Sequence, residues 1–135
     1  MKYDVIDIEG VGEAYALKLK EIGITTVEEL LGRCSSASGR KEVAALTDIS
    51  PKLILKWANH ADLFRINGVG PQFAELLEAS GVDTVKELRH RNARNLAATM
   101  NEVNERKHLT HRVPSAGELQ KMIDEAATLD PVMTY

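Results

Sequence analysis

Two short glycine-containing segments are the parts of this chain best suited to chemistry: Gly10-Val11-Gly12 and Gly68-Val69-Gly70. Glycine lacks a Cβ, so it permits a tight turn and lets a ligand approach the main chain closely. Where such a turn leads into a helix, the unpaired amides and the positive end of the helix dipole point the same way. That arrangement favours an anion. The two segments therefore predict binding of phosphate groups through main-chain amides.

Both segments lie within a longer internal repeat, with a constant offset of 58 residues. Residues 8–31 and 66–89 share 11 identities in 24 positions. The identities outside the turns include Ala16 with Ala74, Leu19 with Leu77, Gly23 with Gly81, Thr26 with Thr84, Glu29 with Glu87 and Leu30 with Leu88. A repeat of this kind determines the architecture. We therefore expect two repeat units, residues 1–64 and 65–135, packed as one compact domain.

The elements that must position the turns are predicted to be helices. Apolar residues recur at spacings of three and four, and no stretch shows the alternation expected of a strand. Helix ends are indicated by Gly23 and Gly81, and helix starts by capping boxes that begin at Thr26, Thr84 and Ser115 and by Ser50-Pro51 and Asn92. The fold class we predict is all-α, with a loop over residues 32–39, a helix over 40–46 and an extended tail over 132–135.

Composition limits the class of protein. The 135 residues carry a net charge of −3 and only 4% aromatic side chains, which argues against a base-stacking surface for single strands. Cys34 is the single cysteine, so a disulfide framework within the chain is excluded. No apolar run approaches the ~18 residues that a membrane span needs. We expect a soluble, cytoplasmic protein without a membrane partner.

Charge is unevenly distributed along the chain. Residues 86–112 hold seven Lys and Arg against three Glu, a local balance of +4, which leaves −7 for the remainder. Such asymmetry can mark an interaction face, although it is also typical of ordinary solvated helix surface. The cations that we take as candidates for phosphate contact are Arg89, Arg91, Arg94, Arg106, Lys107 and Arg112.

The sequence resembles a known structural family. An apolar-Gly-apolar-Gly turn followed three residues later by an aromatic residue and then alanine is similar to the helix-hairpin-helix motif. Two such units resemble the tandem helix-hairpin-helix fold of DNA repair and recombination proteins, and the whole chain resembles a bacterial helix-hairpin-helix family of unknown function. The resemblance implies contact with the DNA backbone, without sequence reading, at Gly10, Val11, Gly12, Gly68, Val69 and Gly70.

The chain departs from that motif directly after each turn. The motif commonly places a cation there, whereas this chain has Glu13 after the first turn and Pro71-Gln72 after the second. Glu13 would repel phosphate, and Pro71 supplies no amide donor. The second turn, with Gln72, is therefore the better candidate for phosphate contact. The alternative is that both turns only let helices cross closely.

No catalytic group is predicted. The glycine turns lack the third glycine of a dinucleotide fingerprint and the Lys-Ser/Thr of a phosphate loop. His108 and His111 are three residues apart, which alone is weak evidence for a metal site, and Cys34 has no identifiable base. Trp57 is most simply a core residue, with a partner-binding role as the alternative. We therefore expect no enzyme activity, no cofactor and no bound metal.

Two functions remain open from the sequence. The first is a non-catalytic module that binds the phosphate backbone of double-stranded DNA. The second is a protein-interaction module with purely structural turns, whose partner meets an apolar patch that includes Trp57, Phe64 or the tail Val132–Tyr135. The acidic net charge favours the second, and the repeat with its basic segment favours the first. Neither the partner nor the oligomeric state follows from the sequence.

Overall fold

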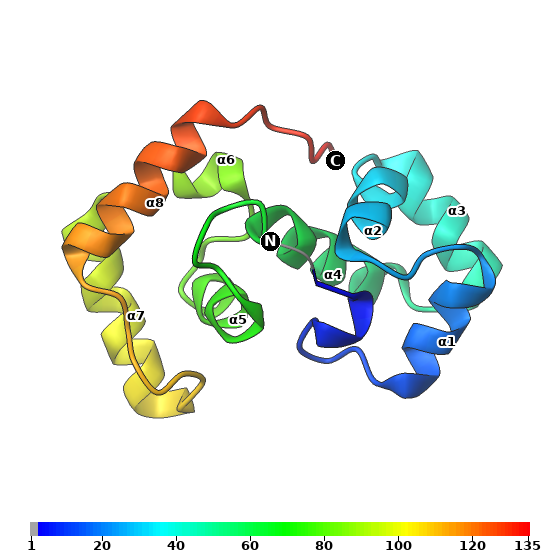
Figure 1. Cartoon of the computed structure of the whole chain (residues 1–135), viewed down its shortest axis with the longest axis horizontal. Helices are drawn as coiled ribbons and strands as arrows, with labels where there is room; N and C mark the ends of the chain where they lie inside the picture. Colours follow the sequence, from blue (N-terminus) through cyan, green and yellow to red (C-terminus); the bar gives the residue numbers. More distant parts are fainter. Residues whose placement is uncertain (1–2) are drawn as a thin grey trace. The chain divides into compact units, whose positions relative to one another are not determined.

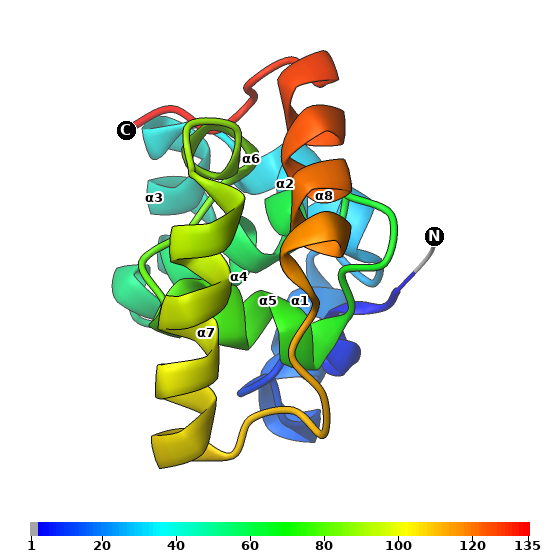
Figure 2. The same ribbon diagram turned by 90° about the vertical axis from the view of Figure 1, so that its left-hand side faces the viewer.

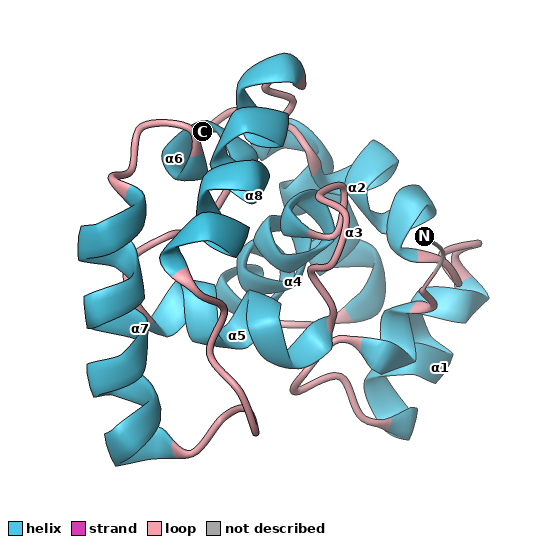
Figure 3. Cartoon of the chain, turned by 60° about the vertical axis from the view of Figure 1, so that its left-hand side comes forward, coloured by secondary structure: helices cyan, strands magenta, loops and turns pink. Residues whose placement is uncertain are grey.

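The computed structural model describes residues 3–135, and these residues form helices and loops without a named strand (Figure 3). The prediction of an all-α protein is confirmed. A short 3-10 helix, η1, spans Val5–Asp7. The α-helices are α1 (Glu13–Glu21), α2 (Val27–Cys34), α3 (Ala37–Thr47), α4 (Pro51–Leu63), α5 (Pro71–Ala79), α6 (Val85–Leu88), α7 (Ala93–Lys107) and α8 (Ala116–Thr128).

The chain divides into two compact units. Unit 1 consists of Met1–Asp62 together with the tail Val132–Tyr135, and unit 2 consists of Leu63–Pro131. Unit 1 therefore contains η1, α1, α2, α3 and nearly all of α4, whereas unit 2 contains α5 to α8 (Figure 1). Each unit carries one copy of the Gly-Val-Gly turn.

The two copies of the turn have the same backbone conformation. Gly10 and Gly68 have φ values of 92° and 88°, a left-handed region that side chains disfavour. The amide of Val11 donates to the carbonyl of Ile8 over 3.0 Å, and the equivalent bond in the second copy is 3.2 Å long. Gly12 and Gly70 then take extended backbone as the N-caps of α1 and α5. The sequence repeat is thus also a repeat of conformation.

The later half of the repeat matches almost as closely. Gly23 and Gly81 both have positive φ after their helices. Thr26 caps α2 in a reciprocal capping box with Glu29, as predicted. Thr84 caps α6 through its hydroxyl, but the Glu87 carboxylate accepts from Arg91 and not from the Thr84 amide. The second predicted capping box is therefore half formed, because Arg91 competes for the carboxylate.

The predicted loop over residues 32–39 is wrong. α2 continues to Cys34, and α3 starts at Ala37, not near residue 40. The hydroxyl of Ser36 accepts from the amide of Gly39 over 3.1 Å and caps α3. A run of small polar residues that reads as a loop thus holds a helix start, because serine is a strong N-cap.

Unit 1 is built around Trp57, whose side chain is fully buried and meets the ring of Tyr15 edge to face, with 5.1 Å between ring centroids. Trp57 is a core residue, as its simplest interpretation predicted. The tail is held on the same unit. Arg40 donates to the carbonyl of Thr134 over 2.6 Å, and the Tyr135 hydroxyl donates to Asn59 over 3.1 Å. Val132–Tyr135 lacks regular structure but is fixed in place.

Unit 2 is a four-helix arrangement in which α7 and α8 run side by side (Figures 1 and 2). The face of α7 predicted from its spacing is the buried one, since Leu96, Met100 and Val103 are all closed to solvent. Leu119 and Ile123 of α8 are buried as well. Phe64 is 4% exposed, so it offers no surface to a partner. Over residues 3–135, no helix is both long and apolar enough to cross a membrane.

Candidate phosphate-binding site

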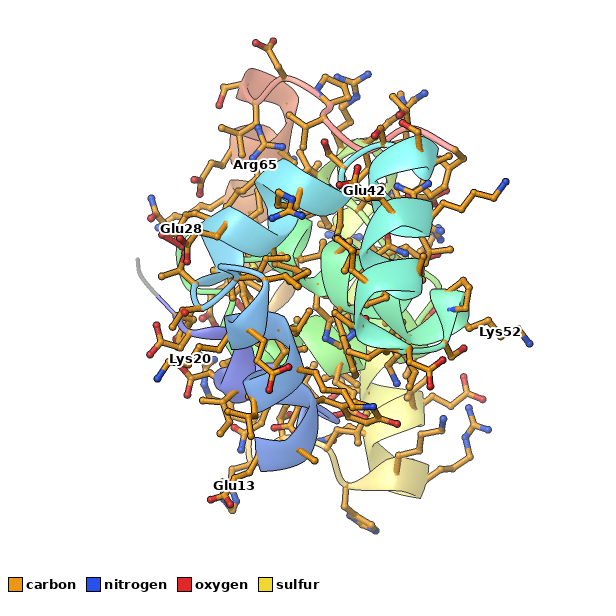
Figure 4. The ribbon with its side chains drawn as sticks, turned by 90° about the vertical axis from the view of Figure 1, so that its right-hand side faces the viewer. Glu13, Lys20, Glu28, Glu42, Lys52 and Arg65 are labelled. Carbon is orange, nitrogen blue, oxygen red and sulfur yellow. The ribbon has the colours of Figure 1, made fainter. Side chains whose placement is uncertain are left out.

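The first turn is open to solvent on its outer side. Gly10 and Gly12 are exposed, and a Cβ added to Gly12 would meet no atom within 4 Å. Beneath Gly10 lies the indole of Trp57, whose Nε1 would be 3.9 Å from an added Cβ. The side chain of Glu13 projects outward from the start of α1 (Figure 4). The first turn is accessible to solvent, but the carboxylate of Glu13 follows directly after it.

The second turn is exposed at Asn67 and Gly68, but α8 of the same unit contacts it. The Glu125 carboxylate accepts a hydrogen bond from the Asn67 amide over 3.1 Å. The Met122 methyl would lie 3.4 Å from a Cβ added to Gly68. A carboxylate from the chain itself therefore accepts from the outer amide of the turn, so this amide is not available to another anion.

The valines of both turns provide no free amide. Val11 and Val69 each donate to a carbonyl within the turn, and both side chains are buried. Any phosphate contact at the turns must therefore come from the glycines and from the first residues of α1 and α5. In α5, Pro71 contributes no donor, which leaves the amides of Gly70, Gln72 and the residue that follows.

The helices that begin at these turns lack a side-chain cap. For α1 and α5 no side chain accepts from the first-turn amides, because a glycine is the N-cap of each. By contrast, α2, α3, α6, α7 and α8 are all capped by a serine, threonine or asparagine side chain. Uncapped first-turn amides are the groups that bind anions at helix N-termini.

The start of α5 opens onto a polar cleft of about 580 Å³. The segment that joins α7 to α8 passes beside the start of α5 (Figure 2), and residues 108–111 of this segment line the cleft. The residues that line it are Gln72, Asn101, Asn104, Glu105, His108, Leu109, Thr110 and His111. Amide and imidazole groups outnumber the single carboxylate, so the cleft is rich in hydrogen-bond donors. We call it the α5–α7 cleft.

The wall of the α5–α7 cleft is held by Asn104. Its carboxamide oxygen accepts from the amides of Leu109 and Thr110 over 2.8 and 3.0 Å, and its nitrogen donates to the Thr110 carbonyl over 3.0 Å. His108 ends α7 in the left-handed region, with φ of 51°. Such a conformation is uncommon outside glycine and is enriched at functional sites. Local hydrogen bonds thus hold the backbone of residues 108–110, which follows α7.

The candidate cations do not form one patch. Arg106 and Lys107 lie in the last turn of α7, and both are exposed without a hydrogen bond or ion pair to any described residue. Arg94 is exposed in the first turn of α7, about 18 Å away along a helix that rises 1.5 Å per residue. Arg89 is half-buried after α6. Neither Arg106 nor Lys107 lines the α5–α7 cleft, although both lie in the last turn of α7 between its lining residues Glu105 and His108.

Two further candidate cations are already paired. Arg91 donates to the Gly81 carbonyl over 2.6 Å and to the Glu87 carboxylate over 3.1 Å. Arg112 forms a two-pronged pair with Glu118, with distances of 2.7 and 3.0 Å. That hydrogen-bonded pair lowers the pKa of Glu118 to about 2. A phosphate would have to displace these carboxylates, so Arg91 and Arg112 are weaker candidates than Arg106 and Lys107.

The other side chains that could be reactive are either buried or not clustered. Burial raises the pKa of the Cys34 thiol to about 11, and its side chain has no exposed surface. The thiol is therefore protonated and inaccessible at neutral pH. Among residues 3–135, no three His, Cys, Asp or Glu side chains gather in a way that could hold a metal ion.

Fold and site together define a small all-α protein with two repeated glycine turns and one donor-rich cleft. Over residues 9–129 the sequence matches the DUF4332 family, which is described as a domain of unknown function. The match covers most of the chain, so the protein belongs to this family. No curated protein and no solved structure matches the chain.

Proposed function

We propose that the protein is a non-catalytic module that binds the phosphate backbone of double-stranded DNA with little sequence preference. The contact face lies in unit 2, where Gly70 and Gln72 of the second turn meet the end of α7 and the segment 108–111. A cytoplasmic location belongs to the same proposal, because a single buried thiol suits a reducing compartment.

One observation carries the proposal: an uncapped helix start lies at a polar cleft, and two cations without a partner among the described residues lie in the turn of α7 that ends at this cleft. α5 begins at a glycine, without a side-chain cap. Gln72, His108 and His111 line the α5–α7 cleft in front of it. Arg106 and Lys107 follow directly along α7 and have no partner among the described residues. Amide donors and imidazoles at the cleft, with cations in the same turn of α7, supply groups that phosphate recognition uses.

The resemblance of the two glycine turns to helix-hairpin-helix motifs supports the same function by analogy. Contacts of this kind reach phosphates and not base edges, so they position a protein on DNA without reading its sequence. The few available cations and the net charge of −3 imply weak binding. We expect a dissociation constant in the range of about 10⁻⁴–10⁻⁶ M, which rises steeply with salt.

Fluorescence anisotropy of a labelled duplex, titrated with protein at about 50 to 200 mM salt, tests the proposal. The affinity should be the same for unrelated duplex sequences. The variant Arg106→Gln/Lys107→Gln should bind more weakly and lower the salt slope by about 1 to 2, since each lost phosphate contact removes about one released counterion.

The matched control removes two exposed cations from unit 1, Lys41→Gln/Lys52→Gln. The change in net charge is the same, but neither residue lies in unit 2. Equal losses in both double variants would point to general charge attraction and would contradict the proposed face. Absence of binding to any duplex at about 50 mM salt would refute the function itself.

A further inference from the structure

Unit 1 carries an apolar groove that the proposed function does not use. It has a volume of about 240 Å³ and lies between η1 and α1, lined by Asp4, Val5, Ile6, Glu13, Ala16, Leu17, Lys20 and Thr25. Ile6 and Leu17 are 45% and 59% exposed, which makes them two of the few large apolar side chains on the surface. We call this the η1–α1 groove.

The groove is preformed. The amide of Val5 donates to the Thr25 carbonyl over 2.8 Å, and the amide of Val27 donates to the Tyr3 carbonyl over 3.0 Å. These bonds tie the segment before η1 to the segment before α2, with a bridge between Asp4 and Thr26. A partner would therefore pay little to order this surface.

The volume of the η1–α1 groove and the structure of its walls limit which partners can bind in it. A volume of 240 Å³ is below the ~300 Å³ at which small-molecule sites begin, so the groove suits one or two side chains of a larger partner. Most of its lining residues belong to η1 and α1, and the extended residues Asp4 and Thr25 lie in segments already joined to each other, so the groove offers no long free edge for an added β-strand. Recognition must come from side chains, as when the apolar face of a helix enters a groove.

Charge restricts the occupant further. Asp4 and Glu13 line the groove against the single cation Lys20, and Glu13 and Lys20 point outward at opposite ends of α1 (Figure 4). Across residues 4–25 the balance is five carboxylates against two lysines. A partner with cations beside its apolar anchors matches this rim, whereas an acidic partner would be repelled.

We propose that the η1–α1 groove binds a basic amphipathic helix of a partner protein, with apolar side chains packed against Ile6 and Leu17 and Lys or Arg facing Asp4 and Glu13. This inference is independent of DNA binding, because every lining residue lies in unit 1. The protein would then carry a nucleic-acid face on one unit and a protein-docking groove on the other.

A designed probe tests the docking groove: a labelled helical peptide with leucine at positions i, i+3, i+4 and i+7 and lysine elsewhere, followed by anisotropy. The full chain should bind it saturably below about 100 µM. Leu17→Ser should weaken binding at least about tenfold, since an exposed anchor is lost without disturbing the core. Leu46→Ser, equally exposed on α3 at 57%, should leave the affinity unchanged.

The matched peptide with glutamate in place of lysine should bind at least about tenfold more weakly, and Glu13→Lys should weaken binding of the lysine peptide. Equal binding of both peptides, no effect of Leu17→Ser, or no saturable binding at about 100 µM would overturn the proposal. Sedimentation of the protein alone tests a different occupant of the groove, a second copy of the same chain. A dimer that Leu17→Ser dissociates would assign the groove to a second copy of the chain and would also overturn the proposal.

Discussion

The two Gly-Val-Gly turns have the same conformation in different surroundings. Gly10 and Gly68 differ by only 4° in φ, and both turns close with the same amide-to-carbonyl bond. The first turn lies over a buried indole and has no contact on its outer side, whereas Glu125 and Met122 of α8 contact the second turn, although Asn67 and Gly68 remain exposed. The comparison teaches that a local repeat determines backbone shape, while non-local neighbours decide which amides a ligand can reach.

The substitution with the largest expected effect on stability removes Trp57, the residue beneath the first turn. Trp57→Ala should lower the free energy of unfolding by about 3–5 kcal/mol, because a fully buried indole leaves a cavity. Urea denaturation measures the loss. Met122→Ala beside the second turn should cost clearly less, since Met122 is only half-buried. Equal losses of unfolding free energy in the two variants would mean that each turn depends equally on the side chain beside it.

Replacing the left-handed glycines is the next largest test. Gly10→Ala and Gly68→Ala should each cost about 1–2 kcal/mol of unfolding free energy, because a Cβ disfavours positive φ. The two variants should lose similar amounts, since a Cβ at Gly10 would lie 3.9 Å from Trp57 Nε1 and a Cβ at Gly68 would lie 3.4 Å from the Met122 methyl, both ordinary contacts. Urea denaturation of both variants measures the two losses. A clearly larger loss for one glycine would mean that its surroundings, and not the backbone conformation that both share, determine the cost.

Removing the internal carboxylate from the second turn has a smaller effect on stability and an opposite effect on binding. Glu125→Ala breaks the bond to the Asn67 amide and should cost about 1 kcal/mol of unfolding free energy. The same change removes a negative charge next to the proposed phosphate contact, so duplex DNA should bind more tightly. Glu125→Gln keeps an acceptor, so it should retain stability while still raising DNA affinity. Weaker DNA binding by both variants would contradict the proposed face.

The smallest expected effect concerns the pKa values of two helix-capping carboxylates, one in each unit. The pKa of Glu29 is lowered by hydrogen bonds from the amides of Thr26 and Thr25, and the pKa of Glu118 falls to about 2 because Arg112 also donates to it. A lowered folded-state pKa stabilises the protein above the unfolded value of about 4.3, and this stabilisation is lost as the pH falls towards 2. NMR titration should show that Arg112→Gln raises the pKa of Glu118 but leaves Glu29 unchanged. A normal pKa for Glu118 in the unmodified protein would contradict the observed pairing.

Sequence reasoning succeeded where the signal is local. The helical class, the cap at Thr26 and the burial of Trp57 follow from spacing and residue type over a few positions. It failed over residues 32–39, where small residues hide the Ser36 cap. It also could not find the contact between Glu125 and Asn67, because the two residues are 58 positions apart and no local pattern links them. The α5–α7 cleft was missed for the same reason.

We propose that DNA phosphates contact unit 2 and not the first turn. NMR chemical-shift mapping with a short duplex at low salt can distinguish these two contacts, because each backbone amide reports separately. The amides of Gly70 and Gln72 and those of residues 106–111 should shift together on titration, while those of residues 10–15 should stay unchanged. Shifts confined to residues 10–15, or no shifts at all, would contradict this proposal.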